Sequence, residues 1–248
     1  MLMIKKLFLG FSLAFSMLTI IPFFKVHNFY KGINGYAVMF YPFIGLLLGI
    51  ILATTFYALE GLVNQTYLYL LVFVLWVGLT GALHLDGVAD SFDALFVPKS
   101  RREEVLKDPH MGAMGMIFTL LFVLLKLSAF MQMQMIYLLP MVLMFSRLNA
   151  VVAIYAFDYI RKDGMGSLAK MELTLWQVSL AIVGVILIAW FDSSQAFLWM
   201  VLLSLLSLAL IYFVAKRYFG GFSGDLYGLL IEASELVMLH LFVFKVLV

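Results

Sequence analysis

Long, uninterrupted apolar runs are the dominant pattern along this chain. They lack the strict alternation of a membrane β-strand and the one-sided periodicity of a soluble amphipathic helix. A helix needs roughly 17–25 residues to cross a bilayer, and backbone polar groups in lipid must be satisfied within the segment. The pattern therefore predicts about seven transmembrane helices, at residues 37–58, 66–85, 113–131, 134–156, 174–191, 196–215 and 228–248.

The apolar segment at residues 7–23 has basic residues on both sides. Lys5 and Lys6 precede it, and Lys25 and Lys31 follow it. Since basic residues favour the cytoplasmic side, a full span would place one pair on the wrong side. We expect a re-entrant or interfacial helix here, with an ordinary eighth span as the alternative. The predicted fold is all-α, a polytopic helical bundle of the membrane in one domain over residues 1–248.

Basic residues also predict the orientation of the bundle. They gather in the loops at 86–112, 157–173 and 216–227, whereas the connections near 60–65, 131–135 and 192–195 contain no Lys or Arg. Cytoplasmic loops carry an excess of Lys and Arg. The sequence thus places the three loops that contain Lys and Arg in the cytoplasm.

Composition supports the membrane assignment and excludes several kinds of site. Of 248 residues, 65% are hydrophobic and 12% are charged, with a mean hydropathy of +1.09, whereas soluble domains are about 45–50% apolar. A net charge of +2 predicts no nucleic-acid partner. The absence of cysteine excludes disulfides, thiolate metal sites and cysteine nucleophiles.

Three aspartates follow the second predicted span in the stretch "GALHLDGVADSFDAL". Asp86, Asp90 and Asp93 have the spacing i, i+4, i+7, which places them on one face of a helix. Their charges repel one another, so we expect a cation against them; a solvated helix start is the alternative. Oxygen ligands favour Mg²⁺ or Mn²⁺ over zinc. His84, just before them, contacts substrate or has a structural role only.

A second acidic cluster lies in "GGFSGDLYGLLIEASELVML" near the C-terminus. Asp225 and Glu232 are seven residues apart, Glu235 follows, and Ser223 is a candidate helix cap. The orientation places this cluster on the same side as the first aspartates, where the two sets would enclose metal ions and a phosphate. An ion pair with Arg147, which stands within an apolar span, is the structural alternative.

The loop "RREEVLKDPHMGAMG" adds basic candidates. Lys107 and His110 are expected to contact phosphates, whereas residues 101–104 are expected to form a solvated helix face. Arg147 would hold an anionic substrate group or pair with an acid. There is no P-loop, nucleophile elbow or zinc motif. Two readings follow: a metal-dependent membrane transferase acting on phosphates, or a cation-coupled membrane transporter that uses the acids as an ion path. A non-catalytic scaffold would not explain the repelling carboxylates.

The motifs resemble a known family. "LHLDGVADSFDAL" followed by "EEVLKDPHMGAMG" resembles the signature of the adenosylcobinamide-GDP ribazoletransferases, also called cobalamin synthases. "GGFSGDLYGLLIEASEL" is similar to the C-terminal motif of that family, and "TIIPF" and "YPFIGLLLG" fit its N-terminal pattern. Two positions differ: His110 stands where the family often has Arg, and Ser223 keeps the hydroxyl of the more usual Thr.

The resemblance implies a reaction and its partners. Adenosylcobinamide-GDP would react with α-ribazole, or its 5′-phosphate, to give adenosylcobalamin (5′-phosphate) and GMP, a late step of vitamin B12 nucleotide-loop assembly. It implies Mg²⁺, with Mn²⁺ as a substitute, and a multi-pass protein in the lipid bilayer of the bacterial cytoplasmic (inner) membrane, with its active site on the cytoplasmic side. A homo-oligomer and an association with other enzymes of the cobalamin pathway both stay open.

The resemblance also implies roles for the candidate residues. Asp86, Asp90 and Asp93 would hold the metal against the pyrophosphate, with Asp93 as the candidate general base. Asp225 and Glu232 would complete the metal site or orient the nucleotide. The expected substrate contacts are His84, Lys107, Asp108, His110, Arg147, Ser223 and Glu235.

Overall fold

The computed structural model describes residues 3–27, 29–106, 108, 110–161, 163–190 and 195–244. In these ranges the secondary structure is helical, apart from one isolated parallel bridge between Tyr159 and Phe222. The predicted all-α membrane bundle is confirmed. The elements are α1 (Met3–Leu18), α2 (Ile33–Leu59), α3 (Gln65–Thr80), α4 (Leu83–Leu95), η1 (Lys99–Arg101), α5 (Arg102–Val105), α6 (Ala113–Phe130), η2 (Ile136–Leu138), α7 (Leu139–Ala156), α8 (Met165–Glu172), α9 (Leu175–Trp190), α10 (Gln195–Val214), η3 (Ala215–Phe219) and α11 (Gly224–Val243).

The number of spans agrees with the predicted seven when bent helices are counted. Among the described residues, five helical segments are long and apolar enough to cross a membrane: α2, α6, η2 with α7, α10 with η3, and α11. Two further spans arise if each bent pair is one span, α3 with α4 at 82° and α8 with α9 at 92°. Helix α1 has 16 described residues, and whether it spans the membrane or lies at its surface remains a prediction.

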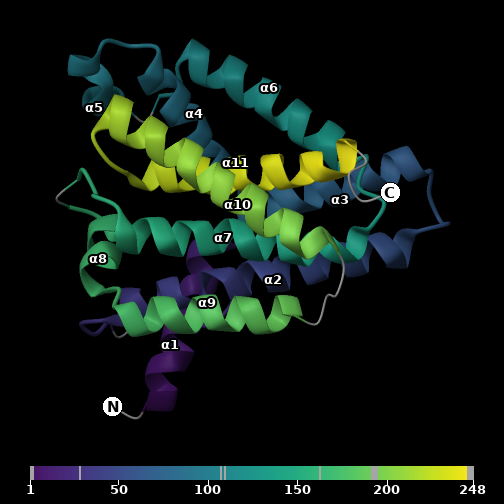
Figure 1. Cartoon of the computed structure of the whole chain (residues 1–248), viewed down its shortest axis with the longest axis horizontal. Helices are drawn as coiled ribbons and strands as arrows, with labels where there is room; N and C mark the ends of the chain where they lie inside the picture. The colour runs from purple at the N-terminus through teal and green to yellow at the C-terminus, as the bar shows by residue number, and fades with distance from the viewer. Residues whose placement is uncertain are drawn as a thin grey trace.

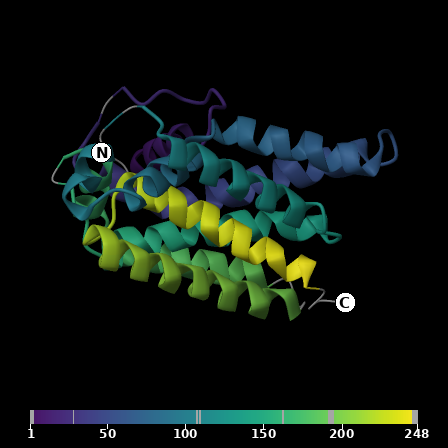
Figure 2. The ribbon, with the colours of Figure 1, turned by 90° about the horizontal axis from the view of Figure 1, so that it is seen from above.

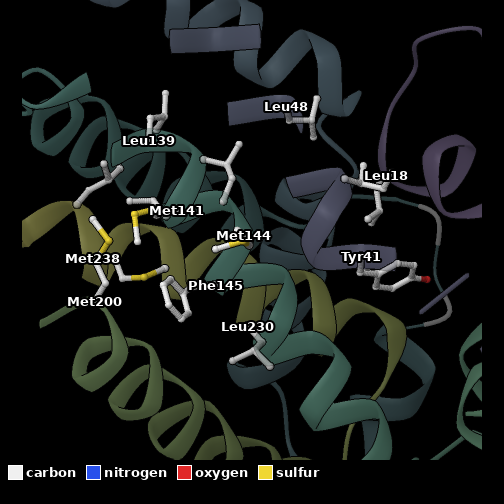
Figure 3. Close-up of a cluster of buried hydrophobic side chains, with 14 of the residues drawn as sticks. Leu18, Tyr41, Leu48, Leu139, Met141, Met144, Phe145, Met200, Leu230 and Met238 are labelled. Carbon is white, nitrogen blue, oxygen red and sulfur yellow. The ribbon is translucent and has the colours of Figure 1, made fainter. Parts of the chain in front are cut away.

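Helices α2 and α7 lie side by side at the centre of the bundle (Figure 1). Glycines permit this close approach, because a Cβ atom at Gly45 would collide with the Leu143 carbonyl and one at Gly49 with the Pro140 backbone. Small residues at helix crossings are typical of membrane bundles. Helices α10 and α11 pack on one side of α7, and helix α9 packs on another side of it (Figures 1 and 2). Figure 3 shows the apolar core between them, including Leu139, Met144 and Leu230.

A buried polar network also joins the helices. The Asn149 amide on α7 donates to the Ser234 hydroxyl on α11 and to the Ser204 carbonyl on α10, both at 2.9 Å. Ser207 adds a 2.9 Å bond to Ser234. In lipid, where unpaired polar groups are costly, such bonds hold the three helices in register.

The chain differs from the predicted spans at three places. The span predicted at 66–85 ends at Thr80, because Gly81 and Ala82 adopt left-handed conformations with φ of 60° and 54°. The chain then turns into α4. A short helix, α8, lies where a loop was predicted at 157–173. The last helix begins at Gly224 rather than 228, capped by Ser223, and residues 245–248 of the predicted span lie outside the described residues.

The basic loops gather at one end of the bundle. Helices α5 and α8 and the turn from α10 into α11 all lie at the left of Figure 1. This is the arrangement that the charge pattern predicted for the loops at 86–112, 157–173 and 216–227. The aspartate-bearing helix α4 reaches the same end.

Candidate active site

A cavity of about 340 Å³ opens at this end of the bundle. Its walls come from the end of α1, from α2, α4, α7 and α8, and from the start of α11. Charged groups of Asp86, Arg161, Asp163 and Asp225 line it together with apolar side chains. The cavity thus joins the two acidic motifs that are about 140 residues apart in the sequence.

The crossing of α4 and α11 brings those motifs together. A Cβ atom at Gly87 would lie 2.6 Å from the Asp225 carbonyl oxygen, and one at Gly228 would lie 3.2 Å from the His84 carbonyl oxygen. Only glycine permits such an approach of the two backbones. The first turn of α11 is therefore held directly against α4. We call the face of α4 that carries Asp86, Asp90 and Asp93 the aspartate stripe.

Two of the stripe's carboxylates have no direct protein partner. Asp86 is exposed and Asp90 is half-buried. In the part of the chain that the structure describes, neither side chain accepts a hydrogen bond or forms an ion pair. The negative charges of Asp86, Asp93 and Asp225 all act on Asp90, and Arg161 opposes them. This excess of negative charge is the environment that attracts a cation.

Asp93 has a different environment from the rest of the stripe. Its two oxygens accept the backbone N–H groups of Gly112 at 2.6 Å and Gly115 at 2.7 Å. It thereby satisfies free N–H groups at the start of α6, where negative charge also interacts favourably with the helix dipole. A Cβ atom at either glycine would collide with the Asp93 carboxylate. Asp93 fastens the loop before α6 to the stripe, and its role as general base remains a prediction.

Asp225 is held by a cation that the sequence analysis used only to orient the chain. Arg161 Nη2 donates to Asp225 Oδ2 at 2.8 Å and to the Leu106 carbonyl at 2.7 Å. The Ser223 hydroxyl lies 3.2 Å from the same carboxylate oxygen and accepts the Leu226 N–H at 3.3 Å. Arg161 therefore links its own loop to the turn at Leu106 and to the first turn of α11. Its position in a predicted basic loop gave no signal of this contact.

Glu232 and Glu235 lie deeper along α11, in a buried cluster of ion pairs. Lys126 Nζ is 2.6 Å from Glu232 Oε2 and also contacts Glu235, and its ammonium group lies 4.3 Å from the centre of the Trp76 ring. Arg147 pairs with Glu235. The ion-pair alternative for Arg147 is thus the one that the structure favours, and we leave Glu232, Glu235 and Arg147 out of the proposed reaction site. Lys126, unnoticed in its apolar span, is the partner that the sequence analysis missed.

The remaining candidates lie on either side of the stripe. His84 is buried against the cavity, and its Nε2 atom has no hydrogen-bond partner. Asp108 and His110 are exposed and bond to each other; the backbone N–H and the ring of His110 lower the pKa of the Asp108 carboxyl. Both line a smaller cavity with Asp90 and Asp93. Lys107, a predicted phosphate contact, lies outside the described residues.

Comparison with known proteins adds the family. The sequence model of the family described as cobalamin-5-phosphate synthase matches residues 10–243. The chain belongs to this family. Similar curated relatives are named adenosylcobinamide-GDP ribazoletransferase: one from Pseudomonas entomophila is 34% identical over 83% of this chain and 86% of its own length. The relative from Deinococcus radiodurans is 32% identical over 95% of this chain and 86% of its own length. The relative from Acinetobacter baumannii is 32% identical over 94% of this chain and 96% of its own length. No solved structure matches the chain.

The carboxylate oxygens at this site are of the chemical type that a hard cation such as Mg²⁺ prefers as ligands. No three Asp, Glu or His side chains within the described ranges are arranged to enclose a metal ion. Mg²⁺, however, usually takes only one or two protein carboxylates and completes its shell with water and substrate phosphates. Asp86 and Asp90, one helical turn apart and without protein partners, match that requirement. Asp93 already accepts backbone N–H groups, and Asp225 already binds Arg161.

Proposed function

We propose that this chain is an adenosylcobinamide-GDP ribazoletransferase. The donor substrate would be adenosylcobinamide-GDP and the acceptor α-ribazole or its 5′-phosphate. The observation that carries the proposal is the pair of carboxylates, Asp86 and Asp90, which have no partner among the described residues. Asp86 lines the cavity that also holds Arg161 and Asp225, and Asp90 lines the smaller cavity. The names of the relatives supply the substrates.

The proposed reaction exchanges a phosphoanhydride bond for a phosphate ester bond. A ribose hydroxyl of α-ribazole attacks the phosphorus next to cobinamide. A new P–O bond to the ribose forms, the bridging P–O bond to the GMP phosphate breaks, and GMP leaves with the bond electrons. The hydroxyl proton must pass to a base. Such a transfer depends chiefly on positioning and on neutralising phosphate charge.

Each aspartate then has a separate task. Asp86 and Asp90 would hold Mg²⁺, or Mn²⁺ in its place, which supplies charge neutralisation to the phosphate oxygens when bound. Both oxygens of Asp93 accept backbone N–H groups, so we assign the general-base role to Asp225 in its place. Arg161 binds Oδ2 of Asp225, and Oδ1 would receive the hydroxyl proton. Asp93 keeps the loop before α6 in place through Gly112 and Gly115.

The proposed location follows from the basic loops. The end of the bundle that carries α5, α8 and the cavity is the end with the Lys- and Arg-containing loops. We therefore place this end on the cytoplasmic side of the bacterial cytoplasmic membrane. Nucleotide substrates made in the cytoplasm would reach the cavity directly.

The deciding experiment measures GMP release by the purified protein in liposomes. It receives adenosylcobinamide-GDP and α-ribazole, with Mg²⁺ or with a chelator. We expect Mg²⁺-dependent GMP release that falls at least a hundredfold in Asp86→Asn, because the amide cannot replace the charge that holds the cation.

Glu60→Gln is the matched control, since Glu60 is an exposed carboxylate outside both acidic motifs. It should retain full activity. A folded wild-type protein that releases no GMP with Mg²⁺ present would refute the proposed activity and return attention to a transporter. Activity that survives Asp86→Asn would refute the metal assignment alone.

A further inference from the structure

We call the buried side chains that line the main cavity its inner part and the charged groups that line it its rim. The inner part includes side chains from α1, α2, α7 and α11, which are buried within the bundle. Figure 3 shows two of them, Leu18 and Tyr41, close together at one edge of the core. The side chains in question are Leu18, Tyr41, Ile154, Tyr227 and Ile231. Such a surface excludes phosphates and favours a flat, apolar group.

Two residues of this lining each carry a buried polar atom without a hydrogen-bond partner among the described residues. The His84 Nε2 atom and the Tyr227 hydroxyl are both unpaired, although His84 is only 5% exposed and Tyr227 only 7%. Leaving a buried polar atom unpaired costs about 1–3 kcal/mol. Native proteins generally avoid this cost unless a ligand or water completes the bond. Both residues line the same cavity.

We infer that this inner part binds the aromatic base of the acceptor nucleoside, with Tyr227 and His84 as its polar contacts. The inference rests on the proposed function and names the part of the acceptor that the cavity selects. The base would enter first, and its ribose would remain near the rim, beside Asp86 and Asp225. That placement brings the attacking hydroxyl to the carboxylates.

The other parts of the two substrates fit this lining poorly. A corrin ring with its side chains is far larger than a cavity of about 340 Å³. Guanine has donors and acceptors along most of its edge, and an apolar wall would leave them unpaired. A benzimidazole base has one free ring nitrogen, an acceptor, once its other nitrogen carries the ribose. One donor, the Tyr227 hydroxyl or the His84 ring N–H, is sufficient to pair with that nitrogen.

The Tyr227 ring is firmly held, so its hydroxyl has a defined position. It stacks against Tyr159 with ring centres 5.9 Å apart and against Phe222 at 5.2 Å. Removing the hydroxyl preserves this stacking. Tyr227→Phe should therefore fold normally, and its unfolding temperature should equal or exceed that of the wild type, since the hydroxyl has no protein partner to lose.

Equilibrium dialysis of α-ribazole against the full chain in detergent tests the inference without any need for turnover. In Tyr227→Phe we expect affinity for α-ribazole to fall roughly two- to tenfold, the value of one neutral hydrogen bond. KM for α-ribazole should rise by the same factor, and KM for adenosylcobinamide-GDP should not change. Tyr212→Phe, an exposed tyrosine that stacks on Phe157, is the matched control.

A second variant fills the cavity. Ala169 on α8 is 4% exposed and lines the cavity, so Ala169→Leu should weaken α-ribazole binding further while sparing the donor substrate. Unchanged α-ribazole affinity in both variants, or equal changes for both substrates, would overturn the inference. Absence of GMP release by the wild type would refute the proposed function instead, and dialysis would still decide whether the base binds.

Discussion

The four aspartates at the crossing of α4 and α11 differ in what surrounds them. Asp93 is held by two backbone N–H groups and Asp225 by Arg161. Asp86 and Asp90 have no such partner within the described ranges and face the cavities at the end of the bundle. A carboxylate that is already satisfied stabilises the fold, whereas an unsatisfied one is available to a ligand. Four residues of one type thereby acquire different tasks.

Arg161 should contribute to activity through Asp225. In Arg161→Met, Asp225 loses its 2.8 Å charged partner and the Leu106 carbonyl loses its donor. Hydrogen bonds to charged groups contribute about 1.5–3 kcal/mol, so kcat/KM for GMP release should fall roughly tenfold to a hundredfold. Steady-state kinetics in liposomes measures this.

Arg161→Lys should recover part of the loss, since Lys keeps the charge but not the planar guanidinium that reaches two acceptors. Arg101→Met is the matched control: Arg101 is exposed and forms only a surface pair with Glu104 at 3.7 Å. An Arg161→Met protein with wild-type kinetics would show that Asp225 does not need its cation.

At this scale, the sequence predicted the carboxylates better than their partners. Acidic residues beside apolar runs are conspicuous, and the spacing of Asp86, Asp90 and Asp93 was sufficient to place them on one helix face. Lys126 and Arg161 gave no such signal, because one stands singly in an apolar run and the other in an ordinary basic loop. Which acidic side chain each cation pairs with depends on tertiary packing, and the spacing of residues along the chain does not indicate that pairing.

The short helix α4 is the element on which the site depends. It exists because Gly81 and Ala82 take left-handed conformations and end α3 early. The 82° bend turns the aspartate stripe toward α11 instead of continuing along α3. The apolar run predicted helix before the bend and the aspartate spacing predicted helix after it, but neither indicated the bend itself, since Ala82 is not a residue that usually adopts positive φ.

Gly87→Ala tests the closeness of α4 and α11. The added Cβ atom would lie 2.6 Å from the Asp225 carbonyl oxygen, so the two helices must separate. Overpacking of this kind costs about 1–3 kcal/mol. We expect a lower unfolding temperature in detergent and a greater than tenfold loss of GMP release, because Asp225 moves away from the stripe.

Gly78→Ala provides the comparison. Gly78 is exposed in α3, and a Cβ atom there meets nothing within 4 Å. Alanine favours a helix over glycine by roughly 0.5–1 kcal/mol, so this variant should be as stable as the wild type or more so. Equal behaviour of the two alanine variants would contradict the tight crossing.

Across the whole molecule, the buried ion pairs join helices that lipid alone would not hold in register. Lys126 on α6, Arg147 on α7 and Glu232 and Glu235 on α11 are each no more than 4% exposed. Burying such groups is favourable only while every charge has a partner. The sequence predicted the number of spans and the shared side of the basic loops, because hydropathy and charge act over whole segments. It could not predict this cluster, which requires three helices in their final places.

Removing one member should therefore destabilise the entire bundle. Lys126→Met leaves two buried carboxylates with Arg147 as the one paired cation among the described residues. Breaking a buried pair in this way costs about 3–5 kcal/mol, so the unfolding temperature in detergent should fall strongly. Lys99→Met, at an exposed lysine, should have no effect.

The double variant Lys126→Met with Glu232→Leu should recover much of the lost stability, because a buried pair can often be replaced by apolar residues. If Lys126→Met melts at the wild-type temperature, the cluster does not stabilise the fold.

The cluster also affects how the protein responds to the voltage across the membrane. Two cations and two anions sum to zero. A transmembrane voltage acts on an unbalanced charge by about 2.3 kcal/mol per 100 mV, but on this balanced set it exerts no net force. The cluster itself should therefore add no net pull of the voltage on the packing of α6, α7 and α11, whether the bacterium is respiring or de-energised.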